Sequence, residues 1–308
     1  MNKVWVSGDA VVDLIPNSTT SYLKCPGGAP ANVAVAVSRL GGNSAFFGRA
    51  GDDPFGRFME STLDKEGVDT GFMLLDPAQR TSTVVVDLDS SGERSFTFMV
   101  KPSADQFLQA TDIPEFKQGQ WLHICSIALA NEPSRSSTFL AMEKIKEAGG
   151  FISFDPNLRN EVWINQDDIK PVVLKAIALA DVVKFSDDEL LFLTETASLT
   201  AGLEKIKSYQ NPLVLVTQGA KGALVIHNDN QQQLAGKAIQ PIDTTGAGDA
   251  FVGGLITYLA QSECWNSAAE ITQAVTWANA CGALATTQKG AMTALPSLKQ
   301  LQQYLSGE

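Results

Sequence analysis

Cysteine and histidine are scarce in this sequence. The four cysteines lie far apart and form no Cys-x-x-Cys pair. This spacing argues against a disulfide-built scaffold or a zinc site, and it indicates a reduced protein with buried thiols. The two histidines are His123 and His227. His123 lies within an apolar stretch, which favours a packed core side chain over a ligand.

Long apolar runs and an excess of positive charge are also missing. No run of roughly 20 apolar residues and no signal-peptide pattern is present, so we expect a cytoplasmic protein without a membrane span. The 34 acidic and 23 basic residues give a formal net charge of −11. That charge argues against nucleic acid or an anionic membrane as a partner. An anionic substrate such as ATP would need local positive groups.

Several common active-site motifs are absent. The sequence has no Gly-x-x-x-x-Gly-Lys-[Ser/Thr], which excludes a P-loop enzyme. Gly246 and Gly248 lack the third glycine of a dinucleotide fingerprint and lie far from the first predicted strand. There is no Gly-x-Ser-x-Gly elbow, and no histidine is placed for a Ser/His/Asp triad.

The order of predicted elements indicates an α/β protein. Residues 3–7 and 44–49 have the apolar character of buried strands, and each is followed by a helical segment, residues 33–40 and 52–66. This β-α-β-α order predicts a mostly parallel sheet with right-handed crossovers. The 308 residues contain no repeat or clear linker, so we expect a single domain. Further strands are predicted at residues 121–126, 151–154, 182–185 and 213–216.

Two alternating stretches interrupt this rhythm. Residues 80–87 and 94–100 alternate between the two faces of a strand, and Ser90-Ser91-Gly92 between them favours a turn. The pattern predicts a β-hairpin outside the main sheet, with residues 14–25 as a candidate partner. We therefore expect a small lid, formed by about 14–25 and 81–100, that could exclude water from a crevice.

A stretch at residues 243–251 is the strongest candidate for chemistry. The sequence predicts a strand over 238–242 before it and a helix over 250–259 after it. Backbone amides of a Gly-Ala-Gly turn at a helix N-terminus suit an anion. Asp249 beside them could take a proton from an attacking hydroxyl while the amides stabilise developing charge. The alternative is an ordinary turn with a capping aspartate.

A second glycine-rich stretch, residues 27–32, precedes the first helix. Its Asn32 is either a cap or core amide, or a hydrogen-bonding partner for a hydroxylated ligand. Asp9 and Asp13 follow the first strand, where polar groups face the ligand crevice of an open sheet. The alternative for Asp13 is a turn acid.

Three further segments are weaker candidates. Arg159 follows a strand and is either a phosphate clamp or half of a surface ion pair. The turn at residues 217–222 is a candidate nucleotide wall, although such a turn alone is a weak signal. Asp187 and Asp188 complement the dipole of the helix that they begin. Glu189 in the same turn could instead contact a metal-bound water.

Residues 27–32 and 243–249 resemble the paired signatures of the ribokinase-like (PfkB) family of carbohydrate kinases, in order and spacing over essentially the whole chain. Within that family, residues 25–34, 92–98, 155–159 and 289–296 are most similar to bacterial fructokinases, with aminoimidazole riboside kinases close behind. The resemblance implies a ribokinase-like three-layer sandwich with a mostly parallel central sheet and a small β-strand lid, in one kinase domain over residues 1–308.

The resemblance also implies an activity. It is an ATP-dependent phosphorylation of the primary hydroxyl of D-fructose, giving fructose 6-phosphate. An aminoimidazole riboside kinase, or another nucleoside or ribose kinase, is the alternative within the family. An inactive sugar- or nucleotide-binding regulator is the alternative of another class, and the retention of Asp249 and Arg159 argues against it.

By resemblance, each candidate residue takes a role in phosphoryl transfer. Asp249 would be the base, and Arg159 would contact the transferred phosphate. The anion hole would consist of the amides of Gly246, Ala247 and Gly248. The sugar would be held by Asp13, Gly28, Asn32, Arg159 and Asp249, with Phe98 packing on it. The ATP site would be lined by Lys184, Glu189, Thr217, Gln218, Gly219, Ala220, Lys221, Gly222 and Gly248.

Two ions and a second subunit belong to the same expectation. Glu189 would bind Mg²⁺ through water, although Ser186 stands where the family has an asparagine. A monovalent cation, usually potassium, would be held by Asp243 and Thr245 together with carbonyls near Ala285, Gln288 and Gly290. Family members are often dimers, so a homodimer is an open expectation.

Overall fold

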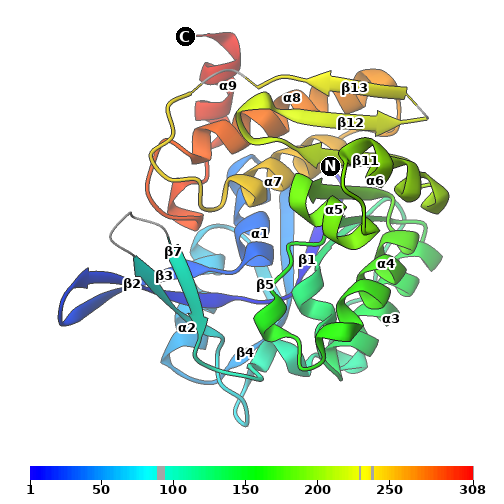
Figure 1. Ribbon diagram of the computed structural model, residues 1–308. Coiled ribbons are helices and arrows are strands. Elements are labelled where there is room, and N and C mark those ends of the chain that lie inside the picture. The colour runs from blue at the N-terminus through cyan, green and yellow to red at the C-terminus, as the bar shows by residue number, and fades with distance from the viewer. Residues whose placement is uncertain (89–93, 229, 237–238, 308) are drawn as a thin grey trace.

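A large, mostly parallel sheet forms the centre of the protein (Figure 1). The structure is a computed structural model and describes residues 1–308 except 89–93, 229, 237–238 and 308. Within those described residues the sheet has nine strands in the order β13-β12-β11-β10-β9-β8-β1-β4-β5. All neighbours are parallel except the β11–β12 and β12–β13 pairs. The strands are β1 (Lys3–Ser7), β4 (Asn43–Gly51), β5 (Asp69–Asp76), β8 (Trp121–Cys125), β9 (Phe151–Asp155), β10 (Val182–Ser186), β11 (Leu213–Thr217), β12 (Ala223–His227) and β13 (Asn230–Leu234).

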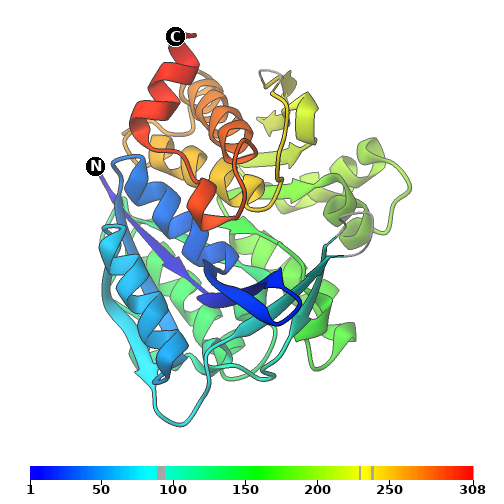
Figure 2. The ribbon, with the colours of Figure 1, turned by 90° about the vertical axis from the view of Figure 1, so that its left-hand side faces the viewer.

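A second, four-stranded sheet stands beside the first (Figure 2). Its order is β3 (Ser21–Gly27), β2 (Val11–Ser18), β6 (Thr83–Leu88) and β7 (Arg94–Phe98). The two segments predicted to form a lid are therefore paired in one sheet, β2 with β6 in parallel register. The small sheet begins at Val11, three residues before the predicted start of the lid segment. The predicted turn at residues 90–92 lies outside the described residues.

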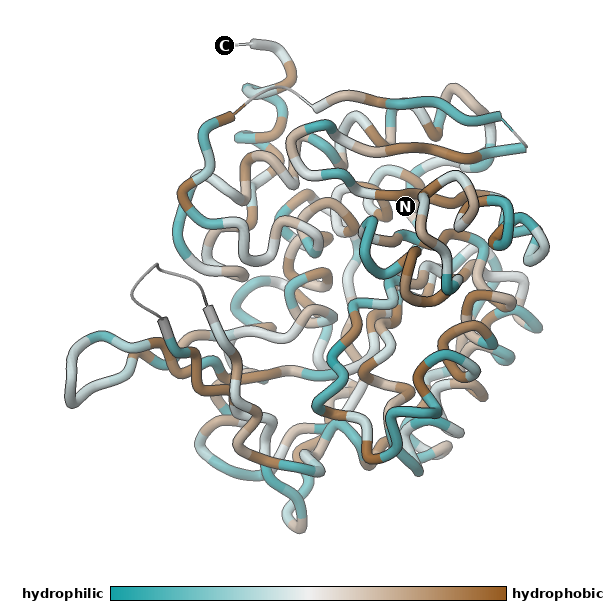
Figure 3. The backbone as a smooth tube through the Cα atoms, in the orientation of Figure 1, coloured by the Kyte–Doolittle hydropathy of each residue, from teal (hydrophilic) through white to brown (hydrophobic). Residues whose placement is uncertain are grey.

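Helices cover both faces of the large sheet because its strands are apolar on both faces. Val4 and Val6 of β1 pack in one core cluster, which also contains residues of α1, α2, α7, α8 and α9. Trp5, which lies between them, packs in a second core cluster on the opposite face, and that cluster contains residues of α3, α4, α5 and α6. Successive side chains of a strand point to opposite faces, so a doubly covered sheet needs apolar residues at every position. The outer strand β13 carries three glutamines and is hydrophilic over most of its length in Figure 3. The helices are α1 (Ala29–Arg39), α2 (Pro54–Lys65), α3 (Ser134–Glu147), α4 (Ile169–Leu179), α5 (Asp187–Thr194), α6 (Leu199–Ile206), α7 (Ala247–Leu259), α8 (Ala268–Ala285) and α9 (Leu298–Ser306).

The segment before α7 differs from its prediction. Residues 239–242 form no strand. Instead the amides of Ile242 and Asp243 both donate to the carbonyl of Thr286, at 2.7 and 3.2 Å. Pro241 has no N–H for a sheet ladder, which favours this irregular path. Helix α7 begins at Ala247, three residues before its prediction, because Gly246 caps it with a φ of 78°.

The edge strand β5 was not predicted. Its apolar run, Phe72 to Leu75, is only four residues long and does not alternate with polar residues, and four of the eight residues of the strand are exposed. Only pairing with β4 identifies this segment as a strand.

Close packing of α1 on α7 joins two distant parts of the chain. A Cβ on Gly253 would lie 2.3 Å from Cβ of Ala36, so this crossing requires glycine. The contact places the first turn of α1, with Asn32, against the first turn of α7, with Asp249. None of the described helices is both long and apolar enough to span a membrane.

Candidate active site

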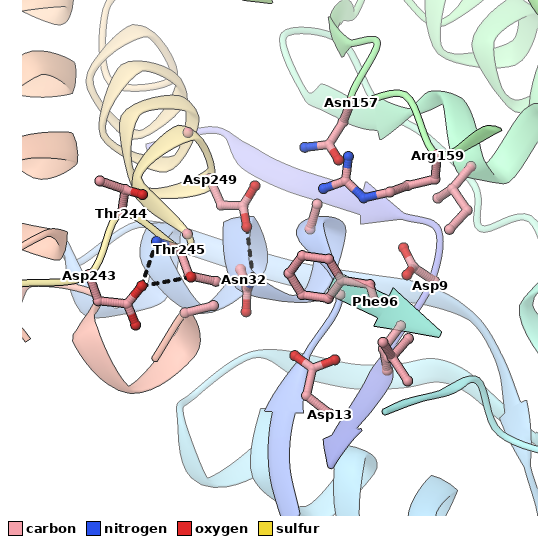
Figure 4. A pocket seen from close by; sticks show the side chains of 18 of the residues that line it. Asp9, Asp13, Asn32, Phe96, Asn157, Arg159, Asp243, Thr244, Thr245 and Asp249 are labelled. Carbon is pink, nitrogen blue, oxygen red and sulfur yellow. Dashed lines mark hydrogen bonds between the residues drawn. The ribbon is translucent and has the colours of Figure 1, made fainter. Parts of the chain in front are cut away.

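A cavity of about 860 Å³ lies between the small sheet and loops at the carboxyl ends of the strands of the large sheet. Parallel strands end at one edge, and ligands of open α/β folds bind there. Strands β2, β6 and β7 supply the small-sheet wall, and the start of α1 and the loop into α7 supply much of the rest (Figure 4). The residues predicted to serve in catalysis or sugar binding that line it are Asp13, Gly28, Asn32, Phe98, Arg159, Gly246, Gly248 and Asp249.

Asp249 is held at the start of α7. Its carboxylate accepts a hydrogen bond from Nδ2 of Asn32 at 2.8 Å, and 8% of the residue is exposed. Burial raises the pKa of Asp249, while the Asn32 hydrogen bond and the charges of Lys184 and Arg159 oppose that rise. A carboxylate with a raised pKa at a helix N-terminus is suited to accept a proton from a bound hydroxyl.

The loop before Asp249 presents backbone to the cavity. A Cβ on Gly246 would lie 2.8 Å from Cα of Ala291, so the left-handed conformation and the crowding both require glycine there. Gly246 caps α7, and the first amides of the helix have no partner within it, while the amide of Ala247 donates to the carbonyl of Thr244 at 3.2 Å. On Gly248 a Cβ would stand 3.5 Å from Nζ of Lys184. An ammonium group therefore flanks the amides that could bind an anion.

Lys184 forms a buried ion pair. Its Nζ donates to Oδ2 of Asp155 at 2.9 Å, and both side chains are almost fully buried. Burial lowers the pKa of Lys184, but the charges of Asp155 and Glu189 outweigh burial and raise it above its ordinary value. Lys184 thus carries a fixed positive charge next to the glycine loop.

The sugar side of the cavity is built on close backbone approaches. A Cβ on Gly28, which has a φ of 96°, would lie 2.6 Å from the carbonyl oxygen of Asp9. A Cβ on Gly27 would lie 2.3 Å from Oδ2 of Asp13. These two glycines let the start of α1 contact β2 and the residues before it. Phe96 and Phe98 of β7 both line the cavity from the lid side.

Asp9 lies on the same side and is buried, with 4% exposed. Its Oδ1 has no hydrogen-bond partner. Burial, followed by the charge of Asp105, raises the pKa of Asp9 from 3.8 to about 8, with Arg159 opposing the rise and Asp249 adding to it. Asp9 is therefore mostly protonated at neutral pH.

Arg159 follows β9, is exposed, and lines the cavity together with Asn157. One of its Nη atoms donates to the carbonyl of Leu158 at 2.8 Å. Figure 4 shows its guanidinium extended toward the space between Asn157 and Asp249. A cation in that position can reach a phosphate bound at the start of α7.

Asp243 ties the glycine loop to the segment after α8. One carboxylate oxygen accepts from the amide and hydroxyl of Thr245, at 3.1 and 2.7 Å. The other accepts from the amide of Gly290 at 2.8 Å. Ala285 is the last residue of α8, where carbonyl oxygens are left outside the helical ladder. Gln288 lies in the same connecting loop.

The predicted nucleotide segment lies beyond the lining of this cavity. Residues 217–222 form a turn after β11, closed by a hydrogen bond of 2.8 Å from the amide of Gln218 to the carbonyl of Gly222. Glu189 accepts from the amide of Ser186 at 2.8 Å and from that of Leu158 at 3.1 Å. Ser186 caps α5 reciprocally. Each Glu189 oxygen thus accepts one hydrogen bond from a backbone amide.

Some residues at the site were missed or given no role by sequence reasoning. Phe96 was passed over in favour of Phe98, although period-two alternation puts both on one face of β7. Asp155 has no sequence signal as the partner of Lys184, because β9 and β10 pair only in the fold. Asn157 and Asp9 lie beside residues that were identified. Asp9 was expected at the crevice, without a role.

Known proteins resemble this chain over nearly its full length. It is 65% identical over 305 residues to a fructokinase of Vibrio alginolyticus, covering 99% of both chains. It is 44% identical over 306 residues to an aminoimidazole riboside kinase of Salmonella typhimurium, covering 99% of this chain and 96% of the other. Two crystal structures of a Vibrio cholerae fructokinase match with a TM-score of 0.96 and 64% identity, covering 99% of this chain and 99% and 98% of theirs. One is in fructose, ADP and calcium ion bound form, and the other, of a double mutant, in fructose, ADP and potassium ion bound form.

The match to a family model covers all the segments that line the cavity. Residues 1–298 match the pfkB family of carbohydrate kinases. That range includes the start of α1, the small sheet and the loop into α7, which together form the site. The chain therefore belongs to the pfkB family of carbohydrate kinases.

Proposed function

We propose that this carbohydrate kinase transfers the γ-phosphate of ATP to the primary hydroxyl of D-fructose, giving fructose 6-phosphate and ADP. The observation that carries the proposal is the placement of Asp249, a buried carboxylate with a raised pKa, at the amide-rich start of α7 in the cavity. The similarity to fructokinases supports fructose as the acceptor.

Asp249 is the proposed base. The bond from the sugar's primary oxygen to the γ-phosphorus forms as the bond from that phosphorus to the bridging oxygen of ADP breaks. The hydroxyl proton passes to the carboxylate of Asp249, which Asn32 orients. The amides of residues 246–248, Lys184 and Arg159 stabilise charge on the transferred group. Positioning and preorganised charge therefore supply most of the proposed rate enhancement.

Sugar binding is assigned to the other side of the cavity. The carboxylate of Asp13, the backbone at Gly28 and the amide of Asn32 are proposed to bind the sugar hydroxyls. Phe98, joined by Phe96, packs against the sugar from the small sheet. Movement of this sheet toward the α7 loop would exclude water, which otherwise competes with the sugar as phosphoryl acceptor.

On the nucleotide side, we assign residues 217–222 and Lys184 to ATP and Glu189 to Mg²⁺ through water. Mg²⁺ usually keeps several waters and binds through few carboxylates plus substrate phosphates. The two backbone bonds of the Glu189 carboxylate fit such indirect contact better than direct ligation. Among the described residues no cluster of three acidic, cysteine or histidine side chains could hold a metal. Mg²⁺ would supply charge neutralisation at the phosphates.

A monovalent cation fits the loop that Asp243 organises. Its carboxylate, the hydroxyl of Thr245 and carbonyls at Ala285, Gln288 and Gly290 would provide oxygen ligands. Such a cation would add positive charge beside the α7 N-terminus and hold the loop in place. Potassium is the proposed ion.

The test is a coupled assay of ADP release with fructose, ribose, adenosine and aminoimidazole riboside as acceptors. We expect kcat/KM to be highest for fructose, and product analysis to find the phosphate at the 6-position. Preference for the riboside would favour the second candidate, which the 44% identity to an aminoimidazole riboside kinase supports. No turnover with any acceptor would refute the kinase proposal and favour an inactive binding protein.

Two further proposals accompany this function. The protein is placed in the cytoplasm, where ATP is available. A homodimer is proposed through the edge of the small sheet, where β3 exposes Tyr22 and Leu23. Light scattering after size exclusion tests this, and a monomer at all concentrations would exclude it.

A further inference from the structure

The buried carboxyl of Asp9 has no role in the proposed transfer of phosphate. It lines the cavity, and only 4% of the residue is exposed. Its Oδ1 nevertheless has no hydrogen-bond partner. Buried polar atoms without a partner are rare and costly in folded proteins. A ligand in the cavity that supplied the missing bond would remove this cost.

The neighbouring strand ends carry further buried polar groups near Asp9. Ser7 and Ile124 are register partners of β1 and β8, so Asp9 and Ser126, each two residues further on, leave the sheet side by side. The hydroxyls of Ser7 and Ser126 are also buried without a partner. Asp105 nearby is satisfied, since Ser103 and Gln106 both donate to it. Of these unpartnered groups only Asp9 lines the cavity, so it is the one whose missing hydrogen bond a ligand there can supply, beside the unpartnered Oδ1 of Asn32.

The position of Asp9 relative to Asp249 indicates which part of a sugar it would meet. In Figure 4 the two carboxyls lie on different sides of the Phe96 ring, with Asp243 and Thr245 on the side away from Asp9. Gly28, which packs on the carbonyl of Asp9, fixes the backbone there. With the reacting hydroxyl at Asp249, the opposite end of the sugar faces Asp9.

We propose that Asp9 binds a hydroxyl at the anomeric end of the sugar and so selects a ketose over a nucleoside. This proposal rests on the proposed function. In the furanose form of fructose, the anomeric carbon bears a hydroxyl and a hydroxymethyl group. A nucleoside has a base there. A protonated carboxyl both donates and accepts, which matches a hydroxyl, and a site built for a hydroxyl discriminates strongly against ligands that lack it.

The test compares three acceptors with the full-length wild-type protein and two variants. The acceptors are fructose, 1-deoxyfructose, which lacks the hydroxyl at C1, and 2,5-anhydromannitol, which lacks the anomeric hydroxyl. The variants are Asp9→Asn, which keeps a neutral hydrogen-bonding group, and Asp9→Leu, which removes it. Ser7→Ala is the matched control, since the hydroxyl of Ser7 is likewise buried without a partner but does not line the cavity and so cannot meet a ligand there.

The expected pattern is a loss that depends on the analogue. One of the two analogues should have a kcat/KM about 10- to 100-fold below that of fructose with the wild type, the range for one unsatisfied buried polar group. Asp9→Leu should lower kcat/KM for fructose by a similar factor, mainly by raising KM. For the analogue that is already a poor acceptor, the same variant should lower kcat/KM little below the wild-type value. Asp9→Asn should recover part of the loss. Ser7→Ala should retain the wild-type preference.

Two outcomes would overturn the proposal, and they differ from failure of the proposed function. Equal losses on all three acceptors would show that Asp9 only supports the fold, as would an unchanged preference in both Asp9 variants. If Asp9→Leu does not fold, the same comparison with Asp9→Asn decides, since the amide matches the size of the carboxyl. Absence of fructose turnover by the wild type would instead refute the proposed function, and this inference with it.

Discussion

Replacing Asp249 by asparagine should separate activity from stability. The amide keeps the size of the carboxyl, and its oxygen can still accept the hydrogen bond from Nδ2 of Asn32, which spans 2.8 Å. It cannot take a proton from the acceptor hydroxyl. A general base contributes about 10²–10⁴ in rate, which corresponds to roughly 3–5 kcal/mol in the barrier. We therefore expect kcat to fall by at least about 10², with the KM for ATP little changed.

The thermal stability of Asp249→Asn should rise although its activity falls. Burial raises the pKa of Asp249, so its ionised form is less favourable in the folded protein than in the unfolded chain. A neutral amide avoids this penalty at neutral pH, as expected where function conflicts with stability. A gain of about 1 kcal/mol corresponds to an increase in Tm of roughly 2 °C for a chain of this size.

The assay pairs steady-state ADP release with thermal unfolding of the same preparations, and Asn32→Ala serves as a comparison that loosens Asp249 but keeps its charge. Activity of Asp249→Asn within about threefold of the wild type would refute its role as base. A large fall in Tm together with lost activity would show that the carboxylate is structural, and the reasoning from burial would then be wrong.

Three further perturbations test other parts of the site. Lys184→Met should lower the free energy of unfolding by about 3–5 kcal/mol in urea titrations, because it leaves Asp155 buried without its partner; a change below about 1 kcal/mol contradicts this. Asp243→Ala should lower kcat about tenfold or more and abolish activation by potassium relative to choline, since it removes three bonds that hold the loop, each contributing about 0.5–1.5 kcal/mol; intact activation would exclude the cation site. Asp9→Asn should gain in Tm relative to the wild type as pH rises from 3.8 toward about 8, because the folded protein holds this proton up to about 8 while the unfolded chain releases it near 3.8; a pH-independent difference would contradict the raised pKa.

Local sequence chemistry was enough to predict the elements that position the site. The alternation at residues 80–87 and 94–100 predicted the β6–β7 hairpin, and pairing of β2 with β6 confirmed a second sheet. The parallel order of the main sheet followed from the alternation of strands and helices. Such signals succeed where one strand or helix carries its own apolar pattern.

The contacts that complete the site depend on pairing between distant segments, and single-sequence reasoning has no access to them. The bond from Asn32 to Asp249 spans 217 residues and exists because Gly253 lets α7 approach α1. The Lys184–Asp155 pair depends on β9 and β10 being neighbours. The strand predicted over 238–242 failed for the same reason, since the carbonyl of Thr286 replaces a sheet ladder for the amide of Ile242.

The charge of the cavity lining connects the buried carboxyl of Asp9 with the proposed cation site at Asp243. Among the residues that the structure describes, this lining contains four acidic side chains, Asp9, Asp13, Asp243 and Asp249, but two basic ones, Arg159 and Lys289. A polyphosphate would meet repulsion if all four acids were ionised and unscreened. A pKa of about 8 keeps Asp9 mostly neutral. A monovalent cation bound at Asp243 would neutralise a second acid. Asp13 and Asp249 would then be balanced by the two basic side chains, with Lys184 adding positive charge beside the α7 amides. The proton on Asp9 and a cation bound at Asp243 would therefore serve one physical requirement, which is to let a protein of net charge −11 accept a polyphosphate next to Asp249.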